Sequence, residues 1–525
     1  MPADIPPFLL PVIALYPEIH YRFRALPFSR CFRRQPEIIA DAPHRLEPGR
    51  PLPILLLIKD ADRYPVTLEE VIIELHGGET RMTHKAGIDP KAIRDHWWHR
   101  IEWVELPDEA PCLWEVSVIW RVKIRGRPHI FITDNLPGLS HKPLQVQQSG
   151  HSLPRKEGWH FGDLHAHCAY TEDQVEFGAP LAAYPSMGRA IGLSFMMAAD
   201  HSYDLDDLPG SFTKMDPNLT RFRTRSSEIE LLNNQYRGEF ALLPGYELSV
   251  ANARGKNVHL LLLNQRDFLP GSGDSAERWL RTGSELSLDE ALISLNPDTL
   301  PVAAHPKMRP PLLQRWLLGR GLWEGEDLRN DRLFGLQVWN GTKSEDFWEG
   351  TECWVDGLLS GKRWRALAGS DAHGNFNRYR QVGFPMWTLA EAEGQIFGEV
   401  RTGVHLKEKL SAEGIVQALT SEPSLISDGP FAEVELRFRS DGSSEAVIEA
   451  LSTPEFGAIS AVRLYWGKEG ETNERILIEE NFQGRYQAKL RIDIPEPSGY
   501  VRSEIRTDAG RFCLTNPRFV SAGTP

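Results

Sequence analysis

The feature that most constrains this chain is a series of short apolar runs in its central part, each followed by polar side chains. The residues at the run ends are His165 and His167, Asp200 and His201, Glu247, His305, Asn340, and Asp371 and His373. Helix-like segments such as 180–192 and 345–359 separate the runs. Apolar runs that alternate with helices are typical of a β/α barrel or a doubly wound sheet, and barrels carry functional residues at the carboxyl ends of their strands. We therefore expect a β/α barrel over 159–406.

His165 and His167 are two residues apart in this pattern. If 159–164 is a strand, its side chains alternate between two sides, so both imidazoles leave on the same side and can bind one metal ion. A single His-x-His is weak evidence, and its weight comes from the polar residues that follow later runs. Asp200 and His201 are adjacent, so only one can face the metal; we assign His201 as the ligand and Asp200 a catalytic role behind it, orienting a ligand or accepting a proton.

The two ends of the chain are rich in strand-like segments with turn residues between them. We predict an antiparallel β-sandwich domain over 1–158 and another over 407–525, with the barrel domain between them. The whole chain is then an α/β protein with flanking β domains. The second flank carries no evident catalytic residues, and packing or oligomer formation is the role expected for it.

Composition narrows the class of protein. The net charge of −13, from 72 acidic and 59 basic residues, argues against nucleic acid or an anionic membrane as a partner. The five cysteines are scattered and form no C-x-x-C pair, which argues against a disulfide framework. No stretch is long and apolar enough to cross a membrane, and the N-terminus is a poor signal peptide. The expected location is the cytoplasm.

At this point the residues resemble a known family. The segments His165-Ala-His167 after Asp163, Asp200-His201, Glu247, His305-Pro306 and Asp371-Ala-His373 are similar in order and spacing to the motifs of the PHP (polymerase and histidinol phosphatase) metallohydrolases. The resemblance covers roughly 159–406. The segments 134–144 and 499–517 resemble the carbaryl-hydrolase-like branch, whose members frame the barrel with β domains.

The resemblance implies a distorted (β/α)7-type PHP barrel with two or three divalent metal ions, Zn, Mn or Fe. It implies a first ion on His165, His167, Glu247 and Asp371, a second on Asp173, His201 and His373, and a third on Glu247, His305 and His259. Asp173 stands where some relatives have His, and its oxygen still suits Zn²⁺ or Mn²⁺. For His259 a role as a core histidine stays open.

The chemistry expected of such a cluster is hydrolysis by metal-activated water. Lys307 and Arg309 follow His305-Pro306 and are candidates to hold an anionic oxygen. The alternative is that both are bases on a loop that face solvent. Arg378 and Arg380 either favour an anion at the pocket mouth or pair with surface acids. We predict a phosphoesterase acting on a small-molecule ester, with a carboxyl or carbamate ester hydrolase as the alternative. The non-enzyme alternative is a carbohydrate-binding or adhesion module, and a homo-oligomer stays open.

Overall fold

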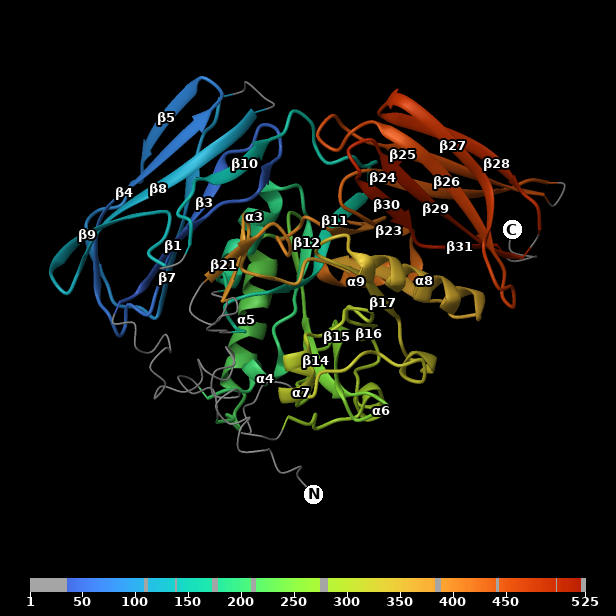
Figure 1. Cartoon of the computed structure of the whole chain (residues 1–525), viewed down its shortest axis with the longest axis horizontal. Coiled ribbons are helices and arrows are strands. Elements are labelled where there is room, and N and C mark those ends of the chain that lie inside the picture. The colour runs from blue at the N-terminus through green and yellow to red at the C-terminus, as the bar shows by residue number, and fades with distance from the viewer. Residues whose placement is uncertain are drawn as a thin grey trace.

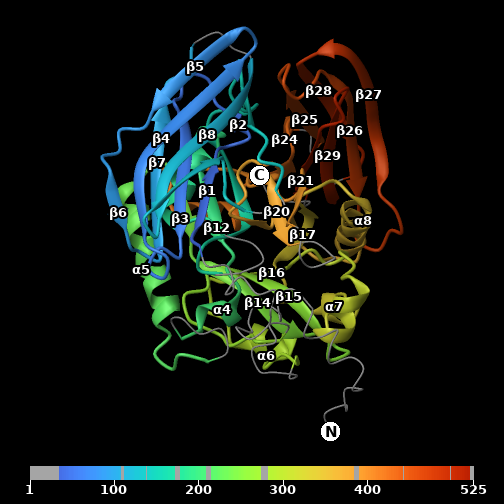
Figure 2. The same ribbon diagram turned by 60° about the vertical axis from the view of Figure 1, so that its left-hand side comes forward.

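The computed structural model describes residues 35–107, 112–136, 139–171, 178–208, 214–273, 282–382, 389–440, 443–496 and 498–520. Two β-rich units, one from each end of the chain, stand side by side (Figures 1 and 2). Beneath them lies the central part of the chain, which carries most of the helices (Figure 1). No helix among the described residues is long and apolar enough to span a membrane.

The N-terminal unit consists of two sheets around a shared core. Its strands are β1 (Glu37–Asp41), β2 (Arg45–Leu46), β3 (Leu52–Lys59), β4 (Val66–Gly77), β5 (Thr80–Lys85), β6 (Lys91–Ile93), β7 (Trp97–Val104), β8 (Cys112–Ile124), β9 (Arg127–Ile132) and β10 (Leu144–Gln148). One sheet has the order β1-β3-β7, and the other has β2-β10-β8-β4-β5, with β6 and β9 paired to β4 and β8. β8 alternates buried and exposed residues because one face packs on the core and the other faces solvent. This unit fits the sandwich predicted for the N-terminal end.

The central unit contains the strands that follow the linker. They are β11 (Trp159–His167), β12 (Phe195–Ala198), β13 (Ala241–Leu243), β14 (Gly245–Ala251), β15 (Asn257–Leu263), β16 (Leu300–Ala303), β17 (Gly335–Asn340), β18 (Arg365–Gly369), β19 (Ala372–His373), β20 (Tyr379–Val382), β21 (Leu389–Ala392) and β22 (Arg401–His405). Its helices are η3 (Leu181–Ala183), α3 (Tyr184–Ala190), α4 (Ser202–Leu205), α5 (Thr220–Gln235), α6 (Leu288–Ile293), α7 (Leu312–Leu317), η4 (Asp327–Arg329) and α8 (Glu345–Leu359).

The C-terminal unit continues directly from the central sheet. It contains α9 (Ala412–Ser421), β23 (Ser424–Ser427), β24 (Phe431–Phe438), β25 (Ser444–Leu451), β26 (Ile459–Gly467), β27 (Arg475–Arg485), β28 (Gln487–Ile494), β29 (Gly499–Thr507), β30 (Phe512–Thr515) and β31 (Arg518–Val520). β22 pairs with β23 across the predicted domain boundary at 406/407. The result is one 11-stranded sheet, β13-β12-β11-β22-β23-β30-β29-β26-β27, with β19 on β11 and β31 on β29. The two predicted domain boundaries, 158/159 and 406/407, stay predictions.

The predicted α/β class and its (β/α)7-type barrel are wrong, because strands far outnumber helices among the described residues. Among the described residues, the strands of the central unit fall into separate sheets: one set joins the 11-stranded sheet, and β14-β15-β16-β17-β18 form a 5-stranded sheet. A parallel barrel needs a crossover helix between successive strands. Here β14, β15 and β16 are instead antiparallel neighbours, and β22 runs antiparallel to β11. The polar residues at the run ends are still brought together, because the two sheets meet edge to edge near His165, where the Asp371 amide donates to the His165 carbonyl over 2.6 Å.

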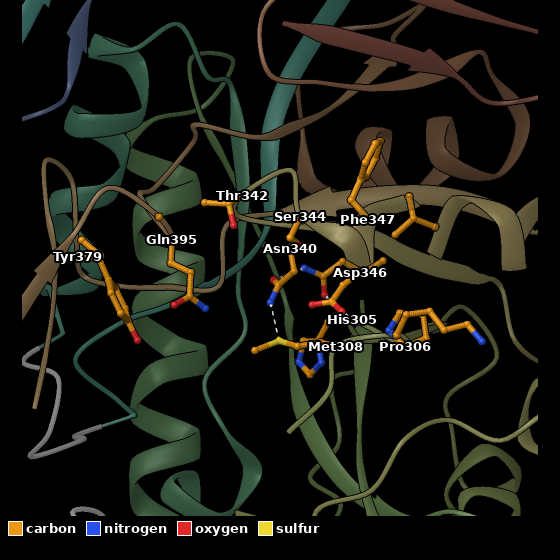
Figure 3. Close-up of a pocket in the computed structure, with 15 residues that line it drawn as sticks. His305, Pro306, Met308, Asn340, Thr342, Ser344, Asp346, Phe347, Tyr379 and Gln395 are labelled. Carbon is orange, nitrogen blue, oxygen red and sulfur yellow. Dashed lines mark hydrogen bonds between the residues drawn. The ribbon is translucent and has the colours of Figure 1, made fainter. Parts of the chain in front are cut away.

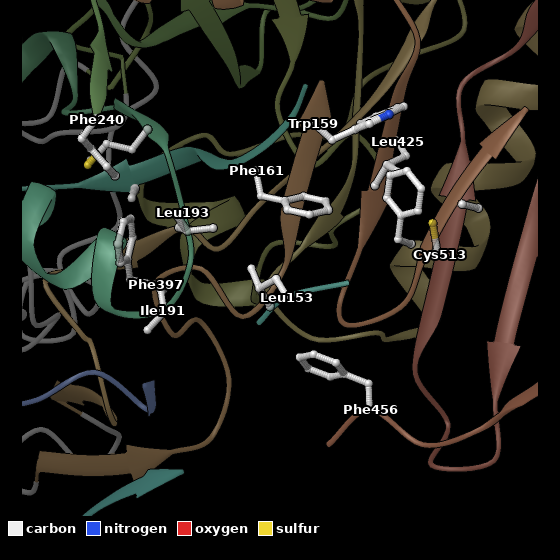
Figure 4. Close-up of a cluster of buried hydrophobic side chains, with 14 of the residues drawn as sticks. Leu153, Trp159, Phe161, Ile191, Leu193, Phe240, Phe397, Leu425, Phe456 and Cys513 are labelled. Carbon is white, nitrogen blue, oxygen red and sulfur yellow. The ribbon is translucent and has the colours of Figure 1, made fainter. Parts of the chain in front are cut away.

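A continuous apolar core ties the central and C-terminal units together. It includes Trp159, Phe161 and Leu193 from the central part and Leu425, Phe456 and Cys513 from the C-terminal part (Figure 4). Beside it, Arg45 of the N-terminal unit donates from Nε to Glu455 Oε1 over 2.8 Å, with the Arg45 side chain only 3% exposed. A buried charge is costly without its partner, so the Arg45–Glu455 pair holds the N-terminal unit against the C-terminal one.

Candidate metal centre

Glu247 on β14 lies at the middle of the predicted ligand set. Its two carboxylate oxygens lie 2.7 to 3.5 Å from ring nitrogens of five histidines, two of them on β11: His165, His167, His201, His259 and His305. The carboxylate is 1% exposed. Neighbouring elements deliver these rings because β11, β14, β15 and β16 end at or pass through one point where the two sheets meet.

Asp371 closes the other side of the cluster. Its Oδ1 lies 3.2 Å from Nε2 of both His165 and His167, whose own Nε2 atoms are 3.1 Å apart. His373, two residues further on, stacks on His167 with ring centroids 4.0 Å apart. Within this centre three overlapping groups have all their ligand atoms within 4.8 Å of one another: His165, His167, Glu247 and Asp371; His167, His201 and His373; and His201, Glu247 and His259.

The structure brings most of the predicted ligands together, and their role as ligands stays a prediction. His165, His167, His201, His259, His305, Glu247, Asp371 and His373 come together. Asp173 lies outside the described residues. For His259, the 2.7 Å contact between its Nδ1 and Glu247 Oε1 places it in the cluster rather than in a separate apolar core.

Burial and the two carboxylates set the ionisation of the cluster. Burial alone would lower the pKa of His165, but the charges of Asp371 and Glu247 outweigh it and raise the pKa to about 9. At His167 burial, reinforced by His373 and His201, holds the pKa well below its ordinary value. Burial opposes ionisation of Glu247 and Asp371, but the surrounding histidines hold the pKa of both well below the usual range. The carboxylates are thus ionised, and burial also lowers the pKa of His305, so His167 and His305 are neutral at neutral pH, the state in which imidazole binds metal.

The backbone is strained at two of these positions. His305 and Asp371 have φ of 30° and 56°, in the left-handed region that non-glycine residues seldom adopt. Gly369 ends β18 against the backbone of His165, and a Cβ there would come within 2.5 Å of the His165 Cβ and amide nitrogen. The close approach that brings Asp371 beside His165 therefore depends on a glycine at 369.

Asp200 lies behind the cluster and is held by a buried arginine. Its carboxylate accepts from the Cys168 amide at 2.8 Å, from Thr171 Oγ1 at 3.0 Å and from Arg225 Nε at 2.5 Å. Burial would raise the pKa of Asp200, but the Arg225 guanidinium outweighs it and holds the pKa at about 2. Thr171 Oγ1 in turn lies 3.3 Å from His167 Nδ1. This geometry suits the orienting role considered for Asp200 and does not suit a proton acceptor near neutral pH.

The bases proposed to hold an anion point elsewhere. Arg309 Nη2 pairs with Glu349 Oε1 at 2.6 Å on the surface, with the arginine side chain 65% exposed. Lys307 borders the cavity next to His305, where its side chain interacts with the thiol of Cys353 on α8. Arg380 reaches Asp41 Oδ2 at 3.4 Å, and Arg378 donates to the Pro143 carbonyl.

Three contributors escaped sequence reasoning. Arg225 sits in the polar helix α5, and Gln337 on β17 binds His165 Nδ1 through Oε1 at 2.8 Å. Arg320 places its guanidinium against His259 Nε2. None follows an apolar run, so the pattern that found the other residues carries no signal for them.

Comparisons with known proteins place the chain in no family. No protein-family model matches it, and no curated protein matches it. Among solved structures, Bacteroides uniformis β-glucuronidase 2 is 10% identical, with 94% of this chain and 61% of that chain covered at a TM-score of 0.17. A Paenibacillus sp. cycloisomaltooligosaccharide glucanotransferase is 10% identical, with 92% of this chain and 71% of that chain covered at a TM-score of 0.19. A Bacteroides cellulosilyticus glycosyl hydrolase family 2 member is 10% identical, with 93% of this chain and 63% of that chain covered at a TM-score of 0.17. The chain thus spans less than two thirds of the β-glucuronidase. Superpositions at such TM-scores define no common fold.

These findings correct the family and activity predicted from the sequence. The PHP assignment is withdrawn, because no family model matches the chain and the strands of the described residues do not form the barrel that the family implies. The phosphoesterase prediction, with its carboxyl or carbamate ester and adhesion-module alternatives, rested largely on that assignment and is withdrawn with it.

Proposed function

We propose that this chain is a metal-dependent hydrolase whose buried centre holds two or three divalent ions. The observation that carries the proposal is the convergence of histidine nitrogens and two ionised carboxylates on one buried point. Five imidazoles around a single carboxylate have little structural use unless ions share their lone pairs.

The residues present fit such ions. His201 Nδ1 is buried without a well-formed hydrogen bond, although it lies 3.1 Å from Glu247 Oε2. A buried ring nitrogen without a hydrogen bond, next to a carboxylate, is the arrangement expected of a metal ligand whose ion is absent. Imidazole with carboxylate suits Zn, Mn or Fe, and the shared positions of Glu247, His167 and His201 suit a cluster rather than a single ion.

Bound divalent ions supply Lewis acidity and lower the pKa of water. The protein residues would do the rest. Glu247, Asp371 and the histidines would hold the ions, and Gln337 would fix the tautomer of His165 through its 2.8 Å contact. Asp200 and Arg225 would keep His167 oriented through Thr171. The partner would be a small molecule, since the centre opens into a cavity of about 420 Å³ beside His305. A cytoplasmic location, the absence of nucleic acid and membrane partners, and a homo-oligomer stay predictions.

Metal analysis of the purified chain tests the proposal. We expect two or three equivalents of Zn, Mn or Fe per chain, lost on chelation and restored by reconstitution. His201→Asn and Asp371→Asn should each lose metal, whereas His76→Asn, an exposed histidine on β4, should retain it. The metal-loaded protein should hydrolyse at least one member of a chromogenic panel spanning glycosides, phosphates and carboxylic esters, and chelation should abolish that activity. Full metal content in both centre variants would refute the metal assignment, and metal without chelator-sensitive hydrolysis would refute the enzyme assignment.

A further inference from the structure

The cavity of about 420 Å³ next to His305 is lined by apolar side chains and by polar ones, among which Lys307 is the one lysine or arginine and Asp346 the one carboxylate. It is bordered by the end of β17, the loop after it, the first turn of α8 and the segment around 392–395. The polar side chains in this lining are mostly amides and hydroxyls: Asn340, Thr342, Ser344, Tyr379 and Gln395, with the carboxyl of Asp346 (Figure 3). The volume is in the range of small-molecule pockets.

Two amides connect this cavity to the metal centre. Asn340 Nδ2 and Gln395 Nε2 both donate to Asp371 Oδ2, over 3.1 and 3.3 Å, and their side chains approach each other from opposite sides in Figure 3. A molecule in the cavity would therefore lie against Asn340 and Gln395, with its inner end towards His305 and Asp371. Asn340, one of the polar residues at the run ends in the sequence, lies at that junction.

Most of the positive charge near the cavity is directed away from it, and Lys307 is the one lysine or arginine among the lining residues. Arg309, Arg378 and Arg380 are engaged with Glu349, the Pro143 carbonyl and Asp41, and Lys307 interacts with Cys353. The amino end of α8, which would otherwise favour an anion, already has Glu345 and Asp346 in its first turn. Arg320 lies against His259 and lines a separate space of about 30 Å³.

The hydroxyl of Ser344 is available in this arrangement. Ser344 is the N-cap residue of α8, but its side chain makes no capping hydrogen bond. Serine at this position ordinarily accepts from the second or third helical amide. Together with Thr342 it presents hydroxyl groups at the open side of the cavity, where both residues are exposed.

We propose that this cavity takes an uncharged, hydroxyl-rich part of the substrate and orients the bond to be broken towards the centre. Amides, hydroxyls and one carboxylate can donate to and accept from several hydroxyl groups at once, whereas an anion would meet the Asp346 carboxylate, with Lys307 as the one lysine or arginine in the lining. This inference rests on the proposed function for the identity of the reacting end, but not for binding itself.

Saturation-transfer NMR on the purified full-length chain tests the inference, with metal content measured on the same samples. The probes are methyl α-D-glucopyranoside, cyclohexanol and inorganic phosphate. We expect transfer to the glucopyranoside and little to cyclohexanol. Thr342→Val and Asp346→Asn should each weaken glucopyranoside binding about tenfold, because the first removes a hydroxyl that would bond to the sugar and the second replaces a charged acceptor by a weaker neutral one. Glu345→Gln, one residue before Asp346 and outside the lining, should leave it unchanged.

The remaining outcomes test the inference and the proposed function separately. Preferential binding of phosphate, equal binding of cyclohexanol, absence of glucopyranoside binding, or binding that Thr342→Val and Asp346→Asn leave intact would each overturn it. A sample that contains no metal yet binds the glucopyranoside in the predicted way would refute the proposed function and support this inference. A sample with full metal and no glucopyranoside binding would do the reverse.

Discussion

Two clusters of histidine and carboxylate occur among the described residues, and they differ in how they are built. The buried centre draws ligands from strands far apart in the sequence, and Glu247 is 1% exposed. The second group, Asp60, Asp62 and His96, lies at the ends of β3 and β7, with side chains 23 to 40% exposed. Both place ligand-type atoms within 4.8 Å of one another. Both clusters therefore combine histidine and carboxylate at the spacing of metal ligands. They differ in burial and in the hydrogen bonds that neighbouring side chains make to the ligand residues.

The largest effect is expected at Glu247. Glu247→Gln keeps the shape of the side chain but removes the charge that two of the ligand groups share. We expect loss of about 5 kcal/mol or more of metal-binding free energy, spread over two ions. Metal analysis after dialysis, with competitive titration, measures it. Asp62→Asn is the matched control in the surface group and should leave the metal content unchanged. Equal metal loss in both variants would remove the distinction between the clusters.

A substitution of Arg225 tests whether the hydrogen bonds behind His167 contribute to stability and metal binding. Arg225→Met leaves Asp200 buried without its 2.5 Å partner, and breaking a buried ion pair costs about 3 to 5 kcal/mol of unfolding free energy. We expect a loss of that size in chemical denaturation at neutral pH, together with weaker metal binding, because His167 loses its oriented Thr171 contact. Arg225→Met with Asp200→Asn should recover much of the stability. If the single variant is as stable as the parent chain, Asp200 does not depend on Arg225.

The residues that come together at the centre could be predicted from the sequence better than the fold that brings them together. His165, Glu247, His305 and Asp371 could be found because each follows an apolar run, and helix 345–359 was predicted with the bounds that α8 has. The barrel was wrong because apolar runs look the same whether neighbouring strands are parallel or antiparallel, and only long-range pairing such as β14 with β15 decides. Arg225 and Gln337 could not be predicted, since their partners lie 25 and 172 residues away.

The pH dependence of the metal-free chain tests the charge of the centre. The pKa of His165 is raised from 6.5 to about 9, so its protonated form stabilises the folded state. That contribution, about 3 kcal/mol, is complete below pH 6.5 and is lost as pH rises through 9. In chelator, the difference in unfolding free energy between the parent chain and His165→Asn should therefore shrink by about this amount between pH 6 and pH 9.5. A difference that does not change with pH would show that His165 is neutral in the folded chain.

The smallest effect is expected in the surface group. His96 Nδ1 lies 3.2 Å from Asp62 Oδ1 and 3.5 Å from Asp60 Oδ1, with the histidine side chain 34% exposed. Exposed pairs of this kind contribute about 0 to 1 kcal/mol, because water competes for both partners and salt screens them. His96→Asn and Asp62→Asn should therefore change the unfolding free energy by less than about 0.5 kcal/mol, and neither should alter the metal content. Calorimetry at low and high salt measures the first quantity and metal analysis the second. A surface variant that loses a bound ion would mean that ligand spacing alone is enough to hold metal in this protein, and that burial of the Glu247 centre serves a purpose other than binding.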